Sequence, residues 1–217
     1  MMKLYGYWRS TAAYRVRIAL HLKGIEFESS SVHLVNNGGE QNSPDYANLN
    51  PTKLVPTLID GDFSLNQSLA IIDYLDNAHT SQNPAVALYP SCHKARAKVQ
   101  ALALDIACEI HPLNNLRVQQ YLANTLHIDN EAKQSWVTYW MDKGFTAIEQ
   151  QLEVSAGEFC FGNQVTVADI CLVAQVYNAH RFKVDMSNFK LINRIVEQCN
   201  TLPAFIKALP ENQHDAQ

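Results

Sequence analysis

Hydrophobic and polar residues alternate along the first eighty residues with the spacing of short strands and helices. The predicted strands lie at residues 3–8, 26–34, 54–59 and 63–66. The predicted helices lie at residues 12–23, 44–49 and from 68 onward. Gly24 predicts the end of the first helix, and Asp60-Gly61 predicts a tight turn between the last two strands.

This β-α-β-α-β-β-α order is that of a thioredoxin-like domain. Residues 79–91 contain two prolines and no periodicity, which predicts a linker. Helical spacing follows at residues 93–126, where Pro112 should kink the helix, and again at residues 131–152. We therefore expect an α/β thioredoxin-like domain at residues 1–82 and an all-helical domain at residues 83–217.

Composition narrows the class of protein. The chain has 217 residues, of which 47% are hydrophobic and 18% charged, as in an ordinary globular protein. A net charge of −4 gives no overall attraction to nucleic acid or to an anionic membrane surface. The sequence predicts neither a membrane span nor a secretory leader. An anionic substrate would have to bind a local group of arginines.

The five cysteines form no CxxC pair, which argues against both a disulfide framework and a metal site. Cys108, Cys160 and Cys171 stand in apolar surroundings and are predicted to be buried. A reducing cytoplasm is the expected location. The polar residues after Pro210 predict a frayed end.

The hydroxyl residues Ser10-Thr11 stand where the first strand ends and the first helix begins. A hydroxyl there can cap the unpaired backbone N–H groups of the helix, or it can hydrogen-bond a ligand. The positive end of the helix dipole also favours an anion such as a thiolate. The residue types alone leave both roles open.

The run WRSTAAYRVRIAL, residues 8–20, resembles the signature of zeta-class glutathione transferases, which read Ser-Ser-Cys followed by Arg-Val-Arg-Ile-Ala-Leu. The segment 15–20 matches the second part, and the triplet is Ser10-Thr11-Ala12. The resemblance extends over residues 3–205 and implies the two-domain glutathione transferase fold. Because Ala12 replaces the family's cysteine, the reactive sulfur is expected to come from glutathione.

Two further segments of the first domain match the same family. Val55-Pro56 precedes a strand; the resemblance implies a cis bond, with the Val55 peptide groups left to pair with an extended ligand. Gln67-Ser68 begins a helix, and the implied role is to hold the γ-glutamyl carboxylate of glutathione. Gln41 matches a glutathione contact. On residue type alone, the proline could be a strand-start device and Gln67-Ser68 a helix cap.

The second domain contributes candidates of its own. His111 and Asn115 are four residues apart, which predicts one shared helix face, and the resemblance implies that they line the glutathione site. Arg9, Arg117 and Arg181 could each be a surface residue, but together they suit a substrate with two carboxylates. Thr166-x-x-Asp169 is a capping-box pattern with a folding role.

The resemblance implies an enzyme: a glutathione-dependent cis–trans isomerase that converts maleylacetoacetate to fumarylacetoacetate in tyrosine and phenylalanine breakdown. Ser10, then Thr11, and Arg9 are the expected catalytic residues. A homodimer acting on a small dicarboxylate is expected, with glutathione as cofactor and without nucleic acid or membrane partners. The alternatives are a maleylpyruvate isomerase, a general glutathione transferase acting on small electrophiles, and a glutathione-binding protein without catalysis.

Overall fold

The computed structural model describes residues 1–78 and 86–217. The described residues form two compact units: Met1–Leu88 together with Asn200–Gln217, and Tyr89–Cys199. The expected domain boundary, between residues 82 and 83, lies outside the described residues. Residues 200–217, which we had expected to belong to the helical domain, make their contacts in the first unit.

A four-stranded mixed sheet forms the centre of the first unit. Its strands are β1 (Met2–Gly6), β2 (Phe27–Ser31), β3 (Thr57–Asp60) and β4 (Phe63–Asn66), in the order β2-β1-β3-β4. β1 pairs parallel with β2 and antiparallel with β3, and β3 pairs antiparallel with β4. The thioredoxin-like fold is thereby confirmed.

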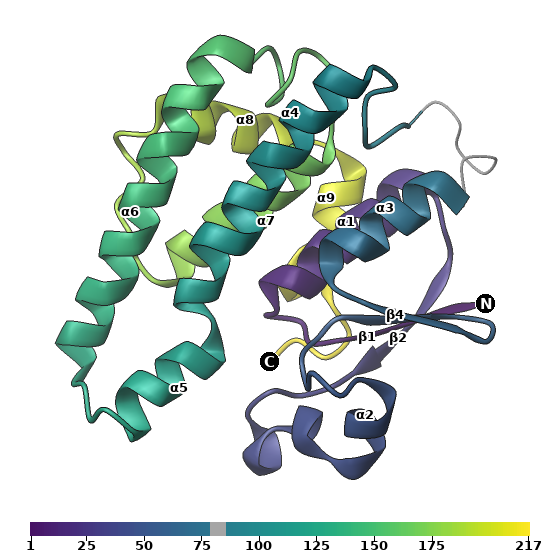
Figure 1. Cartoon of the computed structure of the whole chain (residues 1–217), viewed down its shortest axis with the longest axis vertical. Helices are drawn as coiled ribbons and strands as arrows, with labels where there is room; N and C mark the ends of the chain where they lie inside the picture. Colours follow the sequence, from purple (N-terminus) through teal and green to yellow (C-terminus); the bar gives the residue numbers. More distant parts are fainter. Residues whose placement is uncertain (79–85) are drawn as a thin grey trace. The chain divides into compact units, whose positions relative to one another are not determined.

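Helices cover this sheet. α1 (Thr11–Lys23) and α3 (Ser68–Ala78) lie against one another over the same face, and α2 (Pro44–Leu49) lies on the other side (Figure 1). α1 ends at Gly24, whose φ of 67° is left-handed, as the sequence predicted. α1 is almost wholly buried because α9 (Pro203–Ala208) packs on it as well (Figure 1).

The predicted frayed end is wrong. Residues Pro210–Asn212 form a 3₁₀ turn, Pro210 is buried, and the Asp215 carboxylate accepts hydrogen bonds from the Trp8 N–H and the Ser31 hydroxyl. The polar composition of this segment misled the prediction, because Asn212, Gln213 and Asp215 form hydrogen bonds with the protein although the segment is partly exposed.

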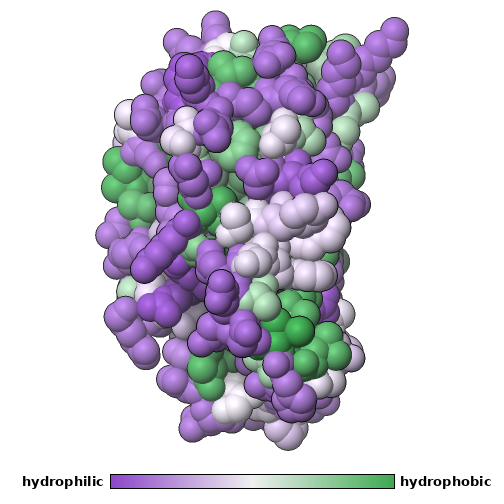
Figure 2. Space-filling view, turned by 90° about the vertical axis from the view of Figure 1, so that its left-hand side faces the viewer, coloured by the Kyte–Doolittle hydropathy of each residue, from purple (hydrophilic) through white to green (hydrophobic). Residues whose placement is uncertain are grey.

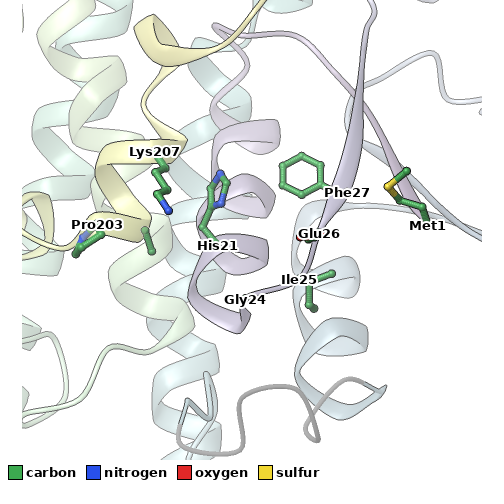
Figure 3. A pocket seen from close by; sticks show the side chains of 9 residues that line it. Met1, His21, Gly24, Ile25, Glu26, Phe27, Pro203 and Lys207 are labelled. Carbon is green, nitrogen blue, oxygen red and sulfur yellow. The ribbon is translucent and has the colours of Figure 1, made fainter.

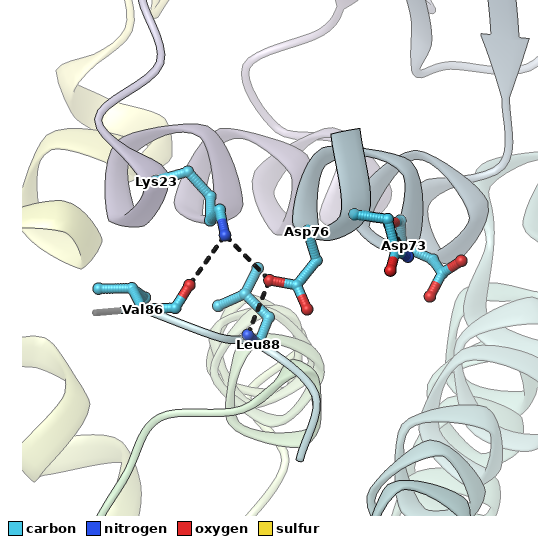
Figure 4. Close-up of polar contacts among 6 residues, drawn as sticks. Lys23, Asp73, Asp76, Val86 and Leu88 are labelled. Atoms are coloured by element: carbon cyan, nitrogen blue, oxygen red, sulfur yellow. Dashed lines mark hydrogen bonds and ion pairs between the residues drawn. The ribbon is translucent and has the colours of Figure 1, made fainter. Parts of the chain in front are cut away.

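A buried ion pair joins α1 to α3. Lys23 Nζ lies 3.0 Å from Asp76 Oδ1, and the two side chains are only 1% and 8% exposed (Figure 4). Lys23 also donates to the carbonyl of Val86, and the N–H of Leu88 donates to Asp76. The pair therefore holds residues 86–88 against α1 and α3.

The second unit is helical. Its α-helices are α4 (His93–Leu104), α5 (Leu116–Asn124), α6 (Asn130–Ser155), α7 (Val167–Arg181) and α8 (Lys190–Asn200). The single kinked helix predicted over residues 93–126 is divided: a π-helical segment, Asp105–Ile110, and a 3₁₀ segment, His111–Asn114, separate α4 from α5. Pro112 lies in the 3₁₀ segment, where its missing N–H prevents a regular α-helix.

The capping box at the start of α7 is confirmed. The Asp169 carboxylate accepts hydrogen bonds from the N–H groups of Thr166, at 2.8 Å, and Cys160, at 2.7 Å. Burial raises the pKa of Asp169, although these hydrogen bonds act in the opposite direction. Cys160 and Cys171 are buried as predicted, but Cys108 is exposed, which corrects our prediction for that residue.

None of the helices in the described ranges is long and apolar enough to cross a membrane. The face shown in Figure 2 is mostly hydrophilic, and its hydrophobic residues lie in separate patches.

Candidate functional site

The loop after β1 presents the hydroxyl pair. The Ser10 N–H donates to the carbonyl of Tyr7 at 2.9 Å, which closes a tight turn, and Ser10 Oγ accepts the Ala13 N–H at 3.2 Å. Ser10 is therefore the N-cap of α1, and Thr11 is its buried first residue. An Oγ that accepts from a backbone N–H still has its own proton to donate. The capping role thus leaves Ser10 able to act as a donor.

Val55-Pro56 is held by a hydrogen-bonded network beneath it. The carbonyl of Leu54 accepts from the Tyr46 hydroxyl at 2.6 Å and from Asn50 Nδ2 at 2.8 Å. Burial raises the pKa of Tyr46, which keeps its hydroxyl protonated as a donor. The Val55-Pro56 bond is cis. Within the described residues, the Val55 N–H and C=O take part in no hydrogen bond.

Gln67-Ser68 forms the start of α3. Gln67 has a φ of 69°, a left-handed conformation that is uncommon for a residue with a side chain. Such conformations concentrate at functional sites, where the surrounding structure maintains them. Ser68 is buried, and its Oγ accepts a hydrogen bond from the buried Arg15. The first N–H groups of α3 lie here, at the positive end of the helix dipole.

Strand register brings these three segments to one end of the sheet. Tyr5 of β1 pairs with Thr57, and Thr57 pairs with Asn66. Val55-Pro56 immediately precedes Thr57, and Gln67-Ser68 immediately follows Asn66. Both therefore flank the end of β1 from which the loop to Ser10 leaves. The three motifs could be recognised in the sequence, and the strand register explains why they lie together in the fold.

The loop that carries Gln41 also belongs to the first unit. Gln41 Nε2 donates to the carbonyl of Leu34 at 3.4 Å, while its Oε1 is buried and has no hydrogen-bond partner among the described residues. Gly39, at a φ of 95°, lies so close that a Cβ there would collide with the Gln41 amide. His33 and Glu40 hold the loop closed through the His33 N–H, which donates to Glu40 Oε2 at 2.6 Å.

The second unit holds the remaining candidates. His111 begins the 3₁₀ segment, and Asn115 is the extended N-cap of α5, with its Oδ1 accepting the Arg117 N–H at 3.1 Å. The prediction that His111 and Asn115 share a helix face is wrong, because His111 lies in a 3₁₀ segment and Asn115 has extended backbone before α5. Sequence reasoning missed the role of Asn114, which is buried and accepts from Asn178 of α7 at 2.6 Å.

The three arginines are exposed, and the structure divides them between the units. The Arg9 guanidinium lies 4.2 Å from the centre of the Trp8 ring in the first unit. Arg117 and Arg181 belong to the second unit, where Arg181 lies 5.2 Å from the ring of Phe182.

The start of α6 holds the two arginine-bearing segments of the second unit. Trp136 Nε1 donates to the carbonyl of Leu113 at 2.8 Å, and Gln134 Nε2 donates to the carbonyl of Phe182 at 2.6 Å. Residues 113–117 and the end of α7 therefore border the same part of α6.

A separate cavity of about 510 Å³ lies where α1 ends beside α9 (Figure 3). His21, Phe27 and Lys207 line it, and none of the predicted site residues does. Burial lowers the pKa of His21, and the charges of Lys207 and Arg17 lower it further. Among residues 1–78 and 86–217, no group of histidine, cysteine and acidic residues is arranged to hold a metal ion.

Both parts of the chain are similar to known glutathione S-transferases. Residues 1–77 match the family model of the glutathione S-transferase N-terminal domain, and residues 117–212 match that of the C-terminal domain. A Vibrio cholerae protein named "Probable maleylacetoacetate isomerase" is 53% identical over 98% of this chain and 97% of its own.

Two solved structures are similar over nearly the whole chain. A bacterial maleylpyruvate isomerase, described as a zeta-class glutathione S-transferase, has a TM-score of 0.94 at 40% identity, covering 99% of this chain and 100% of that one. The maleylacetoacetate isomerase of Methylobacterium extorquens AM1, solved with bound malonate and GSH, has a TM-score of 0.93 at 38% identity, covering 99% of each chain. Together with the motifs at the end of the sheet, these likenesses show that the chain belongs to the zeta class of the glutathione S-transferase family.

Proposed function

We propose that the protein is a glutathione-dependent cis–trans isomerase that converts maleylacetoacetate to fumarylacetoacetate. The observation that supports this proposal most directly is that the segments of Ser10, Val55 and Ser68 lie at the same end of the sheet. The names of the full-length relatives support the same activity.

The groups at this end of the sheet fit glutathione, a short extended peptide with a carboxylate at its γ-glutamyl end and a thiol at its centre. Gln67, Ser68 and the start of α3 would bind the carboxylate, because backbone N–H groups and a hydroxyl meet there. The Val55 peptide groups would pair with the ligand's backbone beside Pro56. The buried Gln41 Oε1 offers an acceptor to a ligand N–H.

Glutathione, when bound, supplies a sulfur nucleophile whose reversible addition to a carbon–carbon double bond allows cis–trans isomerisation. The protein's part is to hold that sulfur as an anion. Ser10 Oγ already accepts the Ala13 N–H, so its own proton is available to the sulfur, and the start of α1 adds a positive dipole. Thr11 is the second candidate donor. Ala12 carries no thiol that could replace glutathione.

The substrate's carboxylates would bind Arg9, Arg117 and Arg181, since a guanidinium binds a carboxylate with two parallel hydrogen bonds. His111 and Asn115 would line the glutathione site. The Methylobacterium relative was solved with malonate, itself a dicarboxylate, which supports a substrate of this kind.

Maleylpyruvate is the second candidate substrate, because a bacterial maleylpyruvate isomerase has a TM-score of 0.94 with this chain. Purified protein should be incubated with glutathione and each substrate in turn. We expect kcat/KM to be higher with maleylacetoacetate. Activity with maleylpyruvate alone would establish the second candidate.

Two other results would indicate that the protein is not an isomerase. Turnover of small electrophiles without isomerisation would indicate a general transferase. Failure to bind glutathione in a calorimetric titration would indicate that the glutathione site is not functional.

We also propose that the protein acts as a homodimer in the cytoplasm, in tyrosine and phenylalanine breakdown. All five cysteines are free thiols, which suits a reducing compartment. Phe63 is exposed and packs on Tyr74, which provides an aromatic surface for a second copy. Light scattering on the purified protein would test the dimer.

A further inference from the structure

The loop that carries Arg9 and Ser10 is fastened to a segment two hundred residues away in the sequence. The Trp8 N–H donates to Asp215 Oδ2 at 3.2 Å, and the Trp8 carbonyl accepts from Arg17 Nη2 at 3.0 Å. Arg17 Nε in turn donates to the carbonyl of Ala208, at the end of α9, at 3.1 Å. Asp215 therefore contacts the Trp8 N–H directly, and Ala208 is linked to the Trp8 carbonyl through Arg17.

Asp215 joins two strand ends with one oxygen. Its Oδ2 also accepts the Ser31 hydroxyl proton at 2.8 Å, so the carboxylate connects the loop after β1 to the end of β2. Ala216 packs against a buried cluster that includes Trp8 and Val55. The segment that carries Asp215 thus contacts both the loop of Ser10 and the apolar cluster beside Pro56.

The path of residues 208–216 is itself fixed. Gln213 Nε2 donates to the carbonyls of Leu209, at 2.8 Å, and Lys207, at 3.0 Å. The Ala216 N–H donates to the carbonyl of Gln213 at 3.0 Å. These contacts hold Asp215 in place independently of the loop that it binds.

We propose that Asp215 is a positioning residue of the isomerase: its carboxylate fixes the Trp8 peptide and thereby the placement of Ser10 and Arg9. Trp8 is only 5% exposed, so its N–H cannot readily exchange Asp215 for water. A bond from an N–H to an ionised carboxylate is stronger than one to a neutral acceptor. Ser10 follows two residues later, so a displaced Trp8 peptide would displace the hydroxyl as well.

The inference rests on the proposed function, and its test starts with the protein free of glutathione. Asp215→Ala removes the acceptor, whereas Asp215→Asn keeps one uncharged oxygen. His214→Ala changes an exposed neighbour. Glu149→Ala removes a partly buried carboxylate of the other unit, which accepts the Leu191 N–H at 2.7 Å and the Ile192 N–H at 3.0 Å. Amide hydrogen exchange at Trp8, followed by NMR, reports on the contact directly.

We expect the Trp8 amide to exchange at least tenfold faster in Asp215→Ala, with a smaller increase in Asp215→Asn. Neither control should change it. The ultraviolet absorbance of the thiolate in bound glutathione should show a raised thiol pKa in Asp215→Ala. The kcat should fall about tenfold, with a smaller change in KM for glutathione, and Asp215→Asn should restore part of it.

Three results would overturn the inference: unchanged Trp8 exchange, an unchanged thiol pKa, or a loss of kcat no larger than in Glu149→Ala. Should Asp215→Ala fail to fold, Asp215→Asn gives the same decision on all three measurements. A wild-type protein that neither binds glutathione nor isomerises either substrate would instead refute the proposed function. Trp8 exchange would still decide whether Asp215 holds the loop.

Discussion

Arg15 Nη1 donates a hydrogen bond to Ser68 Oγ across 3.4 Å, joining α1 to the first residue of α3. A guanidinium has donors and no acceptor, so the Ser68 hydroxyl must direct its own proton elsewhere. The contact therefore orients Ser68 as a donor at the positive end of α3. The buried charge of Arg15 also favours an anion at that point.

Arg15→Met should weaken glutathione binding by about 10- to 150-fold, since a hydrogen bond to a charged group contributes roughly 1.5–3 kcal/mol. Titration calorimetry would measure the change. The comparison ligand is 4-aminobutyryl-cysteinylglycine, which lacks the γ-glutamyl carboxylate and should bind wild type and variant equally. Equal weakening for both ligands would contradict a role at the carboxylate. Arg15→Lys keeps the positive charge and should therefore bind glutathione more tightly than Arg15→Met does.

Ser10→Ala should reduce kcat by about 100-fold, the usual effect of removing one donor to a developing anion. Thr11→Ala should have a much smaller effect. Loss of the helix cap alone costs about 1 kcal/mol of stability. Ser43→Ala is the matched control, because Ser43 caps α2 in the same way, with its Oγ accepting the Tyr46 N–H. Equal losses in the two site variants, or the reverse order, would show that the hydroxyl is assigned wrongly.

Lys23→Met should lower the free energy of unfolding by about 3–5 kcal/mol, because it leaves the Asp76 carboxylate buried without its cation. Urea denaturation would measure the loss. Lys3→Met is the control: Lys3 pairs with Glu28 at 2.9 Å, but both side chains are partly exposed, and such surface pairs contribute about 0–1 kcal/mol. If both variants lost a similar free energy of unfolding, burial would not be what makes the Lys23–Asp76 pair important.

Cys92 should react first with iodoacetamide near pH 7. The backbone N–H groups of Ala95 and Lys94 lower the pKa of its exposed thiol, which raises the thiolate fraction at any given pH. Burial raises the pKa of Cys160 and Cys199, which should stay unmodified in the folded protein. Peptide mass spectrometry would give the order of labelling, and early modification of Cys160 would contradict it.

Local signals in the sequence predicted most of the first unit. The pattern of hydrophobic and polar residues predicted Phe63–Asn66 as a strand and Pro44–Leu49 as a helix, both with the observed bounds. Gly24 and the capping box of Thr166 are equally local, since each is satisfied within a few residues.

The predictions that were wrong concern segments whose structure depends on contacts between residues distant in sequence. Pro112 predicted an irregularity, but its neighbour Asn114 is held by Asn178 of α7, which no spacing rule connects to it. Asp215 looked like part of a solvated end because its partners, Trp8 and Ser31, are far away in sequence. The candidate site shows the same division: its motifs could be read from the sequence, whereas the residues that hold them in place could not.

The assignment of residues 200–217 to the first unit sets an order for synthesis. A ribosome that has made only residues 1–88 has not yet made α9 or Asp215, so α1 emerges with part of its apolar surface uncovered and the Trp8 N–H without its acceptor. The whole helical unit must be translated before these contacts can form. A gene fragment encoding residues 1–88 should therefore yield an incomplete fold, which adding residues 200–217 through a short linker should repair.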